Sequence, residues 1–234
     1  MKLGIMQPYF CPYVGYFQLI NMVDEFVIYD NIEYTRKGWI NRNRMLQNGK
    51  DEYFTLPLKK DSDYLHVNQR VLSDNFNKDK NRVLRKIEAN YRKAPQFKTV
   101  FPIISEIFHC DSKNLFDYIY NSICSINSYL GINTKIIISS GLSVNTEEFK
   151  AQEKVLAICK ELNAEKYINP IGGVELYDKE AFQEQGIELS FIESLPIEYK
   201  QFNNEFVPWL SIIDVMMFNS VEEIRSMLQK YELV

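Results

Sequence analysis

The chain has few residues of the kinds that build metal sites and nucleophilic triads. Its 234 residues include four cysteines and two histidines. The cysteines lie far apart and form no Cys-x-x-Cys pair, so no metal site is expected. We expect free, buried thiols, as in a reducing compartment. The four are Cys11, Cys110, Cys124 and Cys159.

Long apolar runs and an excess of basic charge are also lacking. No segment approaches the ~18 consecutive apolar residues of a membrane-spanning helix. The start, MKLGIMQPYF, lacks the apolar stretch and cleavage site of a signal peptide, so a cytoplasmic protein without membrane insertion is expected. The 27 Lys and Arg are outnumbered by 31 Asp and Glu, giving a net charge of -4, which argues against a nucleic-acid partner.

What is present is an alternation of short apolar strands with helical patterns. Hydrophobic residues make up 46% of the chain, enough to bury the core of one large domain. Strands alternating with helices predict a three-layer α/β fold with a mostly parallel sheet. A helix that begins near Gly15 should join the first two strands in parallel by a right-handed crossover. The predicted strands are 2–6, 25–30, 133–142, 166–170 and 187–193.

Between the second and third of these strands the pattern changes. Asn48-Gly49 is a strong turn signal, and we predict a hairpin on the sheet, with strand 52–60 paired to a strand around Met45. From residue 77 to residue 130 apolar residues recur at helical spacing, and Gly131 suits a helix C-cap. We therefore predict an α/β core domain of residues 1–76 and 131–234 with a helical insertion or subdomain at 77–130.

Two capping-box patterns predict helix starts in the last third of the chain. Asn145 followed by Glu148 should begin a helix that runs to about residue 163. Ser220 followed by Glu223 should begin the last helix, which we expect to include Tyr231. A short helix is expected at 178–186.

Unusual loops follow four of the strands. In an open α/β sheet, ligands bind beyond the carboxyl ends of the parallel strands. The four loops are polar, aromatic or glycine-containing, and their convergence predicts a site. Each loop also has a structural explanation: aromatic cover of a sheet edge, a solvated acidic loop, a helix-start turn or a tight Gly-Gly turn. They read QPYFCPYVGYF, YDNIEYTRKGW, SSGL and NPIGG.

The segment TRKGWINRNR, residues 35–44, is the most specific of these signals. If it is extended, Arg42 and Arg44 share one face, and their forked donors suit phosphate or carboxylate. Trp39 would stack on a base or sugar. The alternative is a solvated basic hairpin. A local excess of positive charge in an acidic protein favours a small anionic ligand such as a nucleotide sugar.

Two further residues have two interpretations each. Cys11 lies in the aromatic loop, but nothing near it in the sequence supplies a base for a nucleophile. Asp214 lies within an apolar helical run that Trp209 should pack against, and burial of its carboxylate requires a partner. It either pairs structurally or faces the site and orients an arginine.

Four long segments carry a resemblance to a known family. They are MQPYFCPYVGYFQLI, FVIYDNIEYTRKGWINRNRM, NPIGGVELYDKEAF and FVPWLSIIDVMMFN, and they look like the signature segments of the WbqC-like family over residues 4 to about 219. The resemblance implies a cytosolic bacterial protein encoded among genes for O-antigen or other surface-polysaccharide synthesis. It implies this context more firmly than any particular reaction.

A looser similarity concerns the first loop and the helix after it. Strand, proline-containing loop and glycine before a helix are similar to the HxGH opening of nucleotidyltransferase-like folds. Tyr13, Val14, Gly15 and Tyr16 stand at the motif's positions. Tyrosine donates one hydrogen bond but cannot carry the positive charge of histidine, so this similarity implies an architecture rather than nucleotidyl transfer.

Together these observations predict a transferase that tailors a nucleotide-linked amino sugar by N-acyl or aminoacyl transfer. The alternatives are a non-catalytic nucleotide-sugar or glycan-intermediate binding protein, or an adenylyl- or nucleotidyl-transfer enzyme. The cofactor is left open: it is an acyl donor, an aminoacyl donor or ATP. The oligomeric state is also left open, with a homo-oligomer as one alternative. The predicted catalytic residues are Tyr13, Tyr16, Asp30 and Ser139. The predicted substrate-binding residues are Gln7, Tyr9, Gly15, Tyr34, Arg36, Trp39, Asn41, Arg42, Arg44, Lys59, Ser140, Asn169, Gly172 and Gly173.

Overall fold

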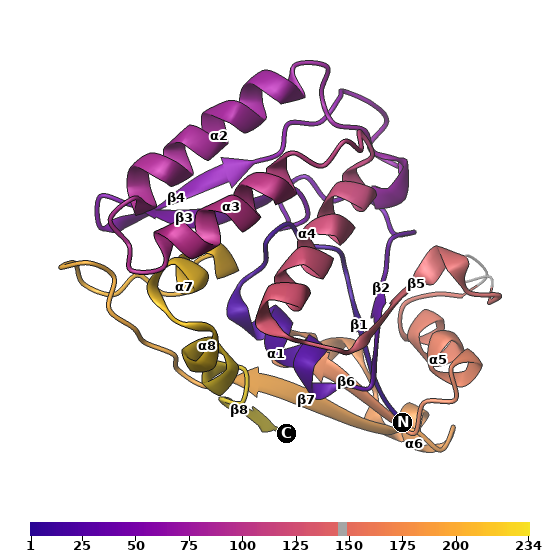
Figure 1. The fold of residues 1–234 in the computed structure, drawn as a ribbon. Helices are drawn as coiled ribbons and strands as arrows, with labels where there is room; N and C mark the ends of the chain where they lie inside the picture. The colour runs from indigo at the N-terminus through magenta and orange to yellow at the C-terminus, as the bar shows by residue number, and fades with distance from the viewer. Residues whose placement is uncertain (145–148) are drawn as a thin grey trace.

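A computed structural model describes residues 1–144 and 149–234, and within them the centre of the molecule is a six-stranded sheet (Figure 1). The strand order is β5-β2-β1-β6-β7-β8. Neighbours pair in parallel except β7 and β8, so the predicted mostly parallel α/β sheet is confirmed. The strands are β1 (Lys2–Met6), β2 (Glu25–Ile28), β5 (Lys135–Ile138), β6 (Lys166–Pro170), β7 (Glu188–Ser194) and β8 (Tyr231–Leu233).

Helices cover both faces of this sheet. The chain runs from β1 through α1 (Val14–Met22) to β2, and from β6 through α6 (Lys179–Gln183) to β7 in the opposite direction across the sheet. Because such crossovers are right-handed, opposite directions place the two helices on opposite faces. Apolar residues of α6 and of α5 (Gln152–Glu161) form one core cluster with β1, and those of α1 belong to the other.

A glycine in β1 lets α1 lie close to the sheet. A Cβ atom at Gly4 would come within 3.1 Å of the Phe26 ring and 3.4 Å of Leu19, which α1 carries. Leu3 and Ile5, on either side of Gly4, belong to the core cluster on the opposite face. The apolar strand is therefore buried on both faces, as expected for a central parallel strand.

Residues 77–130 form helices, as predicted. They are α2 (Phe76–Tyr91), α3 (Phe97–Phe108) and α4 (Leu115–Leu130). Their apolar residues share one core cluster with α1 and with α7 (Ile212–Phe218). Figure 1 shows α2 and α3 gathered with the hairpin of β3 (Arg42–Gln47) and β4 (Lys50–Thr55) at the end of the molecule away from α5 and α6. The domain boundaries drawn from the sequence stay a prediction.

The hairpin itself is placed differently from the prediction. Strands β3 (Arg42–Gln47) and β4 (Lys50–Thr55) form a two-stranded sheet of their own rather than joining the central sheet. The physical reason is that β3 is anchored elsewhere: the N–H of Leu46 donates to the Tyr91 hydroxyl of α2, and Ser211 N–H donates to the carbonyl of Arg44.

Three predictions about helix ends have different outcomes. Gly131 is the left-handed C-cap of α4 (φ 69°), and Ser220 with Glu223 forms the capping box of α8 (Val221–Met227), so both are confirmed. Tyr231 is not helical but pairs with Ser194 in β8. The capping box expected at Asn145 and Glu148 lies outside the described residues.

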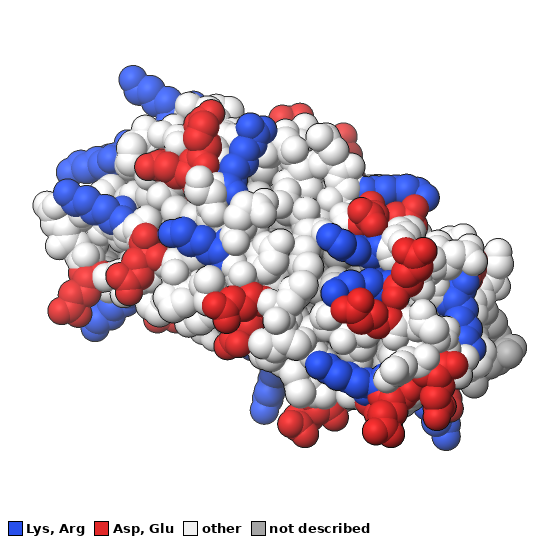
Figure 2. Space-filling model, turned by 90° about the horizontal axis from the view of Figure 1, so that it is seen from below, with Lys and Arg blue, Asp and Glu red and all other residues white. Residues whose placement is uncertain are grey.

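Charge and hydropathy on the folded chain agree with its composition. Figure 2 shows basic and acidic side chains interspersed with uncharged surface, so the described residues of this face present no continuous basic stripe. Among the described residues, every helix is too short or too polar to cross a bilayer. The four cysteines are free, but Cys110 and Cys124 are half-buried rather than buried.

Candidate functional site

A crevice opens where the sheet changes direction. The chain leaves β1 toward α1 on one face and leaves β6 toward α6 on the other, so the loops after these adjacent strands part. Such a switch point is where α/β sheets bind ligands. A cavity of about 660 Å³ lies there, which we call the crevice cavity. Its lining includes Gln7, Tyr9, Lys154, Asn169, Gly172 and Gly173.

Three smaller cavities continue from the crevice cavity. The middle cavity, about 240 Å³, shares Pro170 and Gly172 with it and extends to the end of β7. The apolar cavity, about 380 Å³, shares Tyr13, Ser194 and Trp209 with the middle cavity. The arginine cavity, about 300 Å³, contains Arg44 and shares Tyr9 with the crevice cavity and Tyr13 with the other two. The carboxyl edge of β1, β6 and β7 thus carries a row of adjoining cavities.

Tyr13 lies at the junction of this row, and Gly15 is what allows its position. A Cβ atom at Gly15 would come within 2.3 Å of the Tyr13 ring. The Tyr13 ring also meets the Trp209 ring edge to face, with ring centroids 5.8 Å apart. Burial raises the pKa of Tyr13, so its phenol stays protonated near neutral pH and acts as a hydrogen-bond donor rather than a base.

Trp209 is held in a strained conformation at the same junction. Its φ of 59° is in the left-handed region that bulky residues avoid, and its side chain is 59% exposed. The Arg44 guanidinium donates to its carbonyl at 3.0 Å, and Ser211 Oγ donates to the carbonyl of Cys11, another residue with positive φ. Strain of this kind, kept in place by surrounding bonds, clusters at functional sites.

The two other tyrosines of the first loop differ in exposure. Tyr16 is buried and donates its hydroxyl to the Gln7 carbonyl at 3.0 Å, while Tyr9 lines two cavities. Burial, and then the neighbouring Tyr13, raise the pKa of Tyr9, and burial raises that of Tyr16 well above its usual range. Both therefore remain neutral phenols.

The Gly-Gly turn after β6 has two different surroundings. A Cβ atom at Gly173 would come within 2.0 Å of Asn169 Nδ2, whereas one at Gly172 would meet nothing within 4 Å. Asn169 is fixed by the Tyr167 hydroxyl, which donates to its Oδ1, and by its own donation to the Pro170 carbonyl. Gly173 is thus required by packing, and Gly172 leaves open space beside the cavities.

Two of the three arginines predicted to hold a diphosphate lie near the same ring: the guanidinium carbons of Arg42 and Arg44 are 5.9 and 5.5 Å from the Trp39 ring centroid. The binding roles predicted for the arginines stay predictions. Arg44 lines the arginine cavity and pairs with Asp51 at 3.1 Å. Arg36 pairs with Asp63 at an exposed position. Arg42 donates to the carbonyls of residues 37 and 38 and lies over the Tyr53 ring, which stacks on Trp39.

Asp30 and Ser139 lie together at the ends of β2 and β5 and do not themselves line the row, although Tyr29, the residue before Asp30, lines the crevice cavity. Asp30 is buried and accepts from Ser139 Oγ at 2.7 Å, Ser140 N–H at 2.9 Å and Asn68 Nδ2 at 2.8 Å. With these three hydrogen bonds the carboxylate joins two loops. The catalytic roles predicted for Asp30 and Ser139 stay predictions, and so does the binding role of Ser140.

Three more predicted residues support the hairpin region. Tyr34 donates to Asn41 Oδ1 at 2.8 Å, and Asn41 is buried, with its amide nitrogen on the Leu56 carbonyl. Lys59 is exposed and its N–H donates to the Val71 carbonyl. The binding roles of these three residues also stay predictions.

Asp214 resolves to its structural alternative. It is fully buried and accepts from Tyr91 at 2.7 Å, Tyr199 at 2.6 Å and Gln201 at 2.7 Å. It therefore fixes the irregular segment around residues 199–207 on α7, and among the described residues its hydrogen-bond donors include no arginine.

Sequence reasoning missed Gln18, which lines the middle cavity. It is fully buried, and its Nε2 donates to the carbonyls of Met227 and Lys230, at 2.8 and 2.9 Å. Within the described part of the chain its Oε1 has no hydrogen-bond partner. The sequence contained a signal for this residue, because an amide within the apolar run GYFQLINM is expected to be buried only with hydrogen-bond partners.

Comparison with known proteins shows which family the chain belongs to. The model of the WbqC-like protein family matches residues 7–226, a span that includes Gln7, Tyr13, Gly172 and Trp209. The chain belongs to the WbqC-like protein family. The uncharacterized Mycobacterium tuberculosis protein Rv1507c is 30% identical to this WbqC-like chain over 223 residues, covering 93% of each. No solved structure matches the present WbqC-like chain.

Proposed function

We propose that this WbqC-like protein transfers an acyl or aminoacyl group to the nitrogen of a nucleotide-linked amino sugar, in the synthesis of a bacterial surface polysaccharide. The observation that carries the proposal is the row of adjoining cavities. A group transfer needs two substrates whose reacting atoms meet, and the crevice and apolar cavities each share lining residues with the middle cavity.

The crevice cavity suits the nucleotide diphosphate. Lys154 supplies a cation there, and no side chain among the described residues caps the start of α5, whose first residues also line the cavity. A helix N-terminus and a lysine both favour phosphate, and open space beside Gly172 lets a ligand approach the backbone. Tyr9 and Tyr29 offer rings for the base or ribose.

The middle cavity suits the amino sugar. Tyr13 is a donor for the carbonyl oxygen under attack, and Gln18 lies in the wall of the cavity, with its buried Oε1 unpartnered among the described residues. The amine nitrogen forms a bond to the acyl carbon while the bond to the leaving group breaks. The proton that the nitrogen loses leaves with the departing group, so the reaction balances without a protein base. This suits a site whose tyrosines are neutral.

The second candidate is a protein that binds a nucleotide sugar without transforming it. The hydrogen bonding of Asp30 favours this alternative, because the carboxylate predicted to be catalytic already accepts three hydrogen bonds at the ends of β2 and β5. Nucleotidyl transfer is less favoured than either, because the Tyr16 hydroxyl donates to the Gln7 carbonyl rather than facing a phosphate.

One experiment separates the candidates. The protein is mixed with a panel of nucleotide-linked amino sugars, acyl and aminoacyl donors, and ATP, and products are sought by mass spectrometry, with binding measured by calorimetry. A product with one added acyl or aminoacyl group supports the transferase. Tight binding of a nucleotide sugar without product, across the panel, refutes it in favour of the binding protein.

A further inference from the structure

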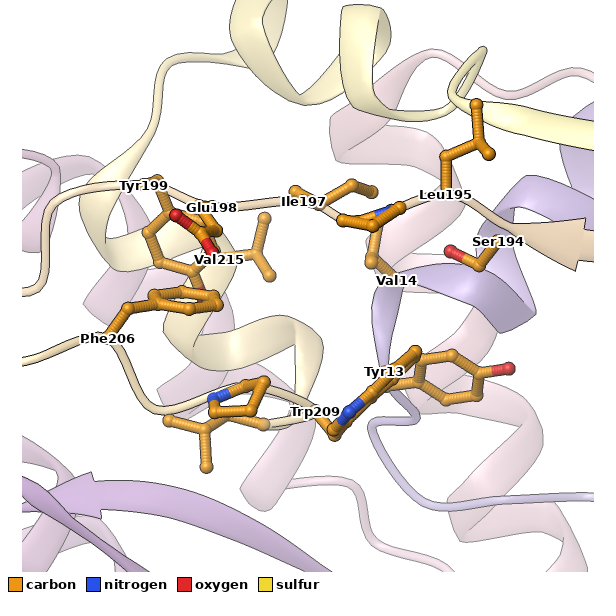
Figure 3. Close-up of a pocket in the computed structure, with 13 residues that line it drawn as sticks. Tyr13, Val14, Ser194, Leu195, Ile197, Glu198, Tyr199, Phe206, Trp209 and Val215 are labelled. Atoms are coloured by element: carbon orange, nitrogen blue, oxygen red, sulfur yellow. The ribbon is translucent and has the colours of Figure 1, made fainter.

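The apolar cavity has a composition unlike that of its neighbours. In Figure 3, Tyr13 and Trp209 lie along one side, with Val14 and Ile197 across from them, and Tyr199 with Phe206 at one end. Its lining also includes two prolines, Leu195, Leu210 and Val215. At about 380 Å³ it falls within the range of about 300–1,000 Å³ that small-molecule sites occupy.

The polar groups of the lining are few and sit at its margins. Of the described residues that line it, Glu198, an exposed acid, is the one charged residue, and none is a cation. The Tyr199 hydroxyl donates to buried Asp214, so this side chain presents its ring. A phosphate or carboxylate would be repelled here, whereas an uncharged aliphatic group would displace water at a gain.

The walls are also preformed. Tyr199 and Phe206 meet edge to face with centroids 5.1 Å apart, as Tyr13 and Trp209 do at 5.8 Å. The Trp209 backbone is held in its strained conformation by Arg44. A cavity whose walls are already fixed binds at a lower entropic cost than one that must form around its ligand.

We propose that the apolar cavity binds the aliphatic chain of an acyl donor, with the reacting carbonyl directed past Tyr13 into the middle cavity. This assignment rests on the proposed function and narrows it: the transferred group is an acyl chain of several carbons rather than a charged aminoacyl group. The cavity then sets the preferred chain length.

Binding of thioester probes tests the proposal without requiring turnover. The chain has two tryptophans, so the full-length Trp39→Phe variant leaves Trp209 as the one fluorescent reporter, at the wall of the cavity. N-acetylcysteamine thioesters from acetyl to octanoyl are titrated against it. We expect Kd to fall about fourfold per added methylene until the cavity is full, with a blue shift of Trp209 emission.

Variants at Ile197 make the test specific. Ile197→Trp should fill the cavity and abolish the dependence on chain length, and Ile197→Ala should move the optimum to longer chains. Val71→Trp, which adds the same ring at a 39% exposed position outside the lining, is the matched control and should behave like the parent once its added emission is subtracted. If Ile197→Trp fails to fold by circular dichroism, the Ile197→Ala optimum decides.

Each outcome has one meaning. No dependence of Kd on chain length in the parent, an unchanged slope in folded Ile197→Trp, or an unchanged optimum in Ile197→Ala would overturn the proposal. Transfer from an aminoacyl donor without any chain-length dependence would leave the transferase standing and remove the acyl assignment. Chain-length-dependent binding without transfer from any donor would keep the cavity's ligand and remove the transferase.

Discussion

The adjacent glycines after β6 allow one substitution to be aimed at the ligand and the other at the fold. At Gly172 an added methyl group meets open space next to the crevice and middle cavities. Gly172 lies in a short 3₁₀ helix, and its φ is outside the left-handed region. Gly172→Ala should therefore raise the stability by about 0.4–1 kcal/mol, because the unfolded chain loses freedom. The same methyl should crowd a bound nucleotide sugar at about 1–3 kcal/mol, which is about 5–150-fold in affinity.

At Gly173 the methyl group instead collides with the Asn169 amide. Displacing that amide disturbs two hydrogen bonds, to Tyr167 and to Pro170, each worth about 0.5–1.5 kcal/mol. Gly173→Ala should therefore cost about 1–3 kcal/mol, and in a chain of this size each kcal/mol lowers the melting temperature by about 2–4 °C.

The assay for both variants is calorimetric melting together with titration of the nucleotide sugar that binds best in the panel. We expect Gly172→Ala to melt at or above the parent temperature with weakened binding, and Gly173→Ala to melt lower. If Gly172→Ala binds as tightly as the parent, the ligand does not lie against this turn and the crevice assignment is wrong. If Gly173→Ala melts like the parent, the packing explanation is wrong.

Three other predictions concern charged groups. Lys154→Ala should weaken nucleotide-sugar binding by about 10–150-fold, whereas Lys160→Ala, on the exposed side of α5, should leave the calorimetric Kd unchanged. Arg44→Ala should weaken binding more than Arg42→Ala, whose guanidinium serves backbone carbonyls, and equal losses would contradict the placement of Arg44. Burial raises the pKa of Asp214, so the contribution of this group to the free energy of unfolding is present at low pH and is lost as pH rises through the raised pKa. Asp214→Asn should flatten this pH dependence in urea unfolding between about pH 4 and 8. An unchanged profile would refute Asp214 as its cause.

The sequence predicted the elements that depend on local patterns. The first strand, helix and strand follow from apolar runs buried on both faces, and the caps at Gly131 and Ser220 follow from residue types with known end geometry. The position of the candidate site followed from the alternation of strands and helices, because the carboxyl ends of parallel strands lie at one edge of the sheet.

The rest depends on contacts that no local pattern contains. The hairpin leaves the central sheet because Tyr91, on another helix, receives the N–H of its strand. Trp209 was expected to pack at the start of a core helix, but a left-handed backbone turns it toward solvent. The last strand was taken as helix because the Gln18 amide, which binds the carbonyls at the end of α8, lies more than two hundred residues away in sequence.

The pairing of β1 with β6 has a consequence for synthesis of the protein. Lys2 is in register with Lys166, so the first strand made on the ribosome waits for one of the last to pair on that side. Non-local pairing of this kind slows folding. A nascent chain can pair β1 with β2 early. The loops after β1 and β6, which line the crevice on its two sides, come together only after most of the chain has been translated. A product of premature termination would therefore lack one side of the crevice.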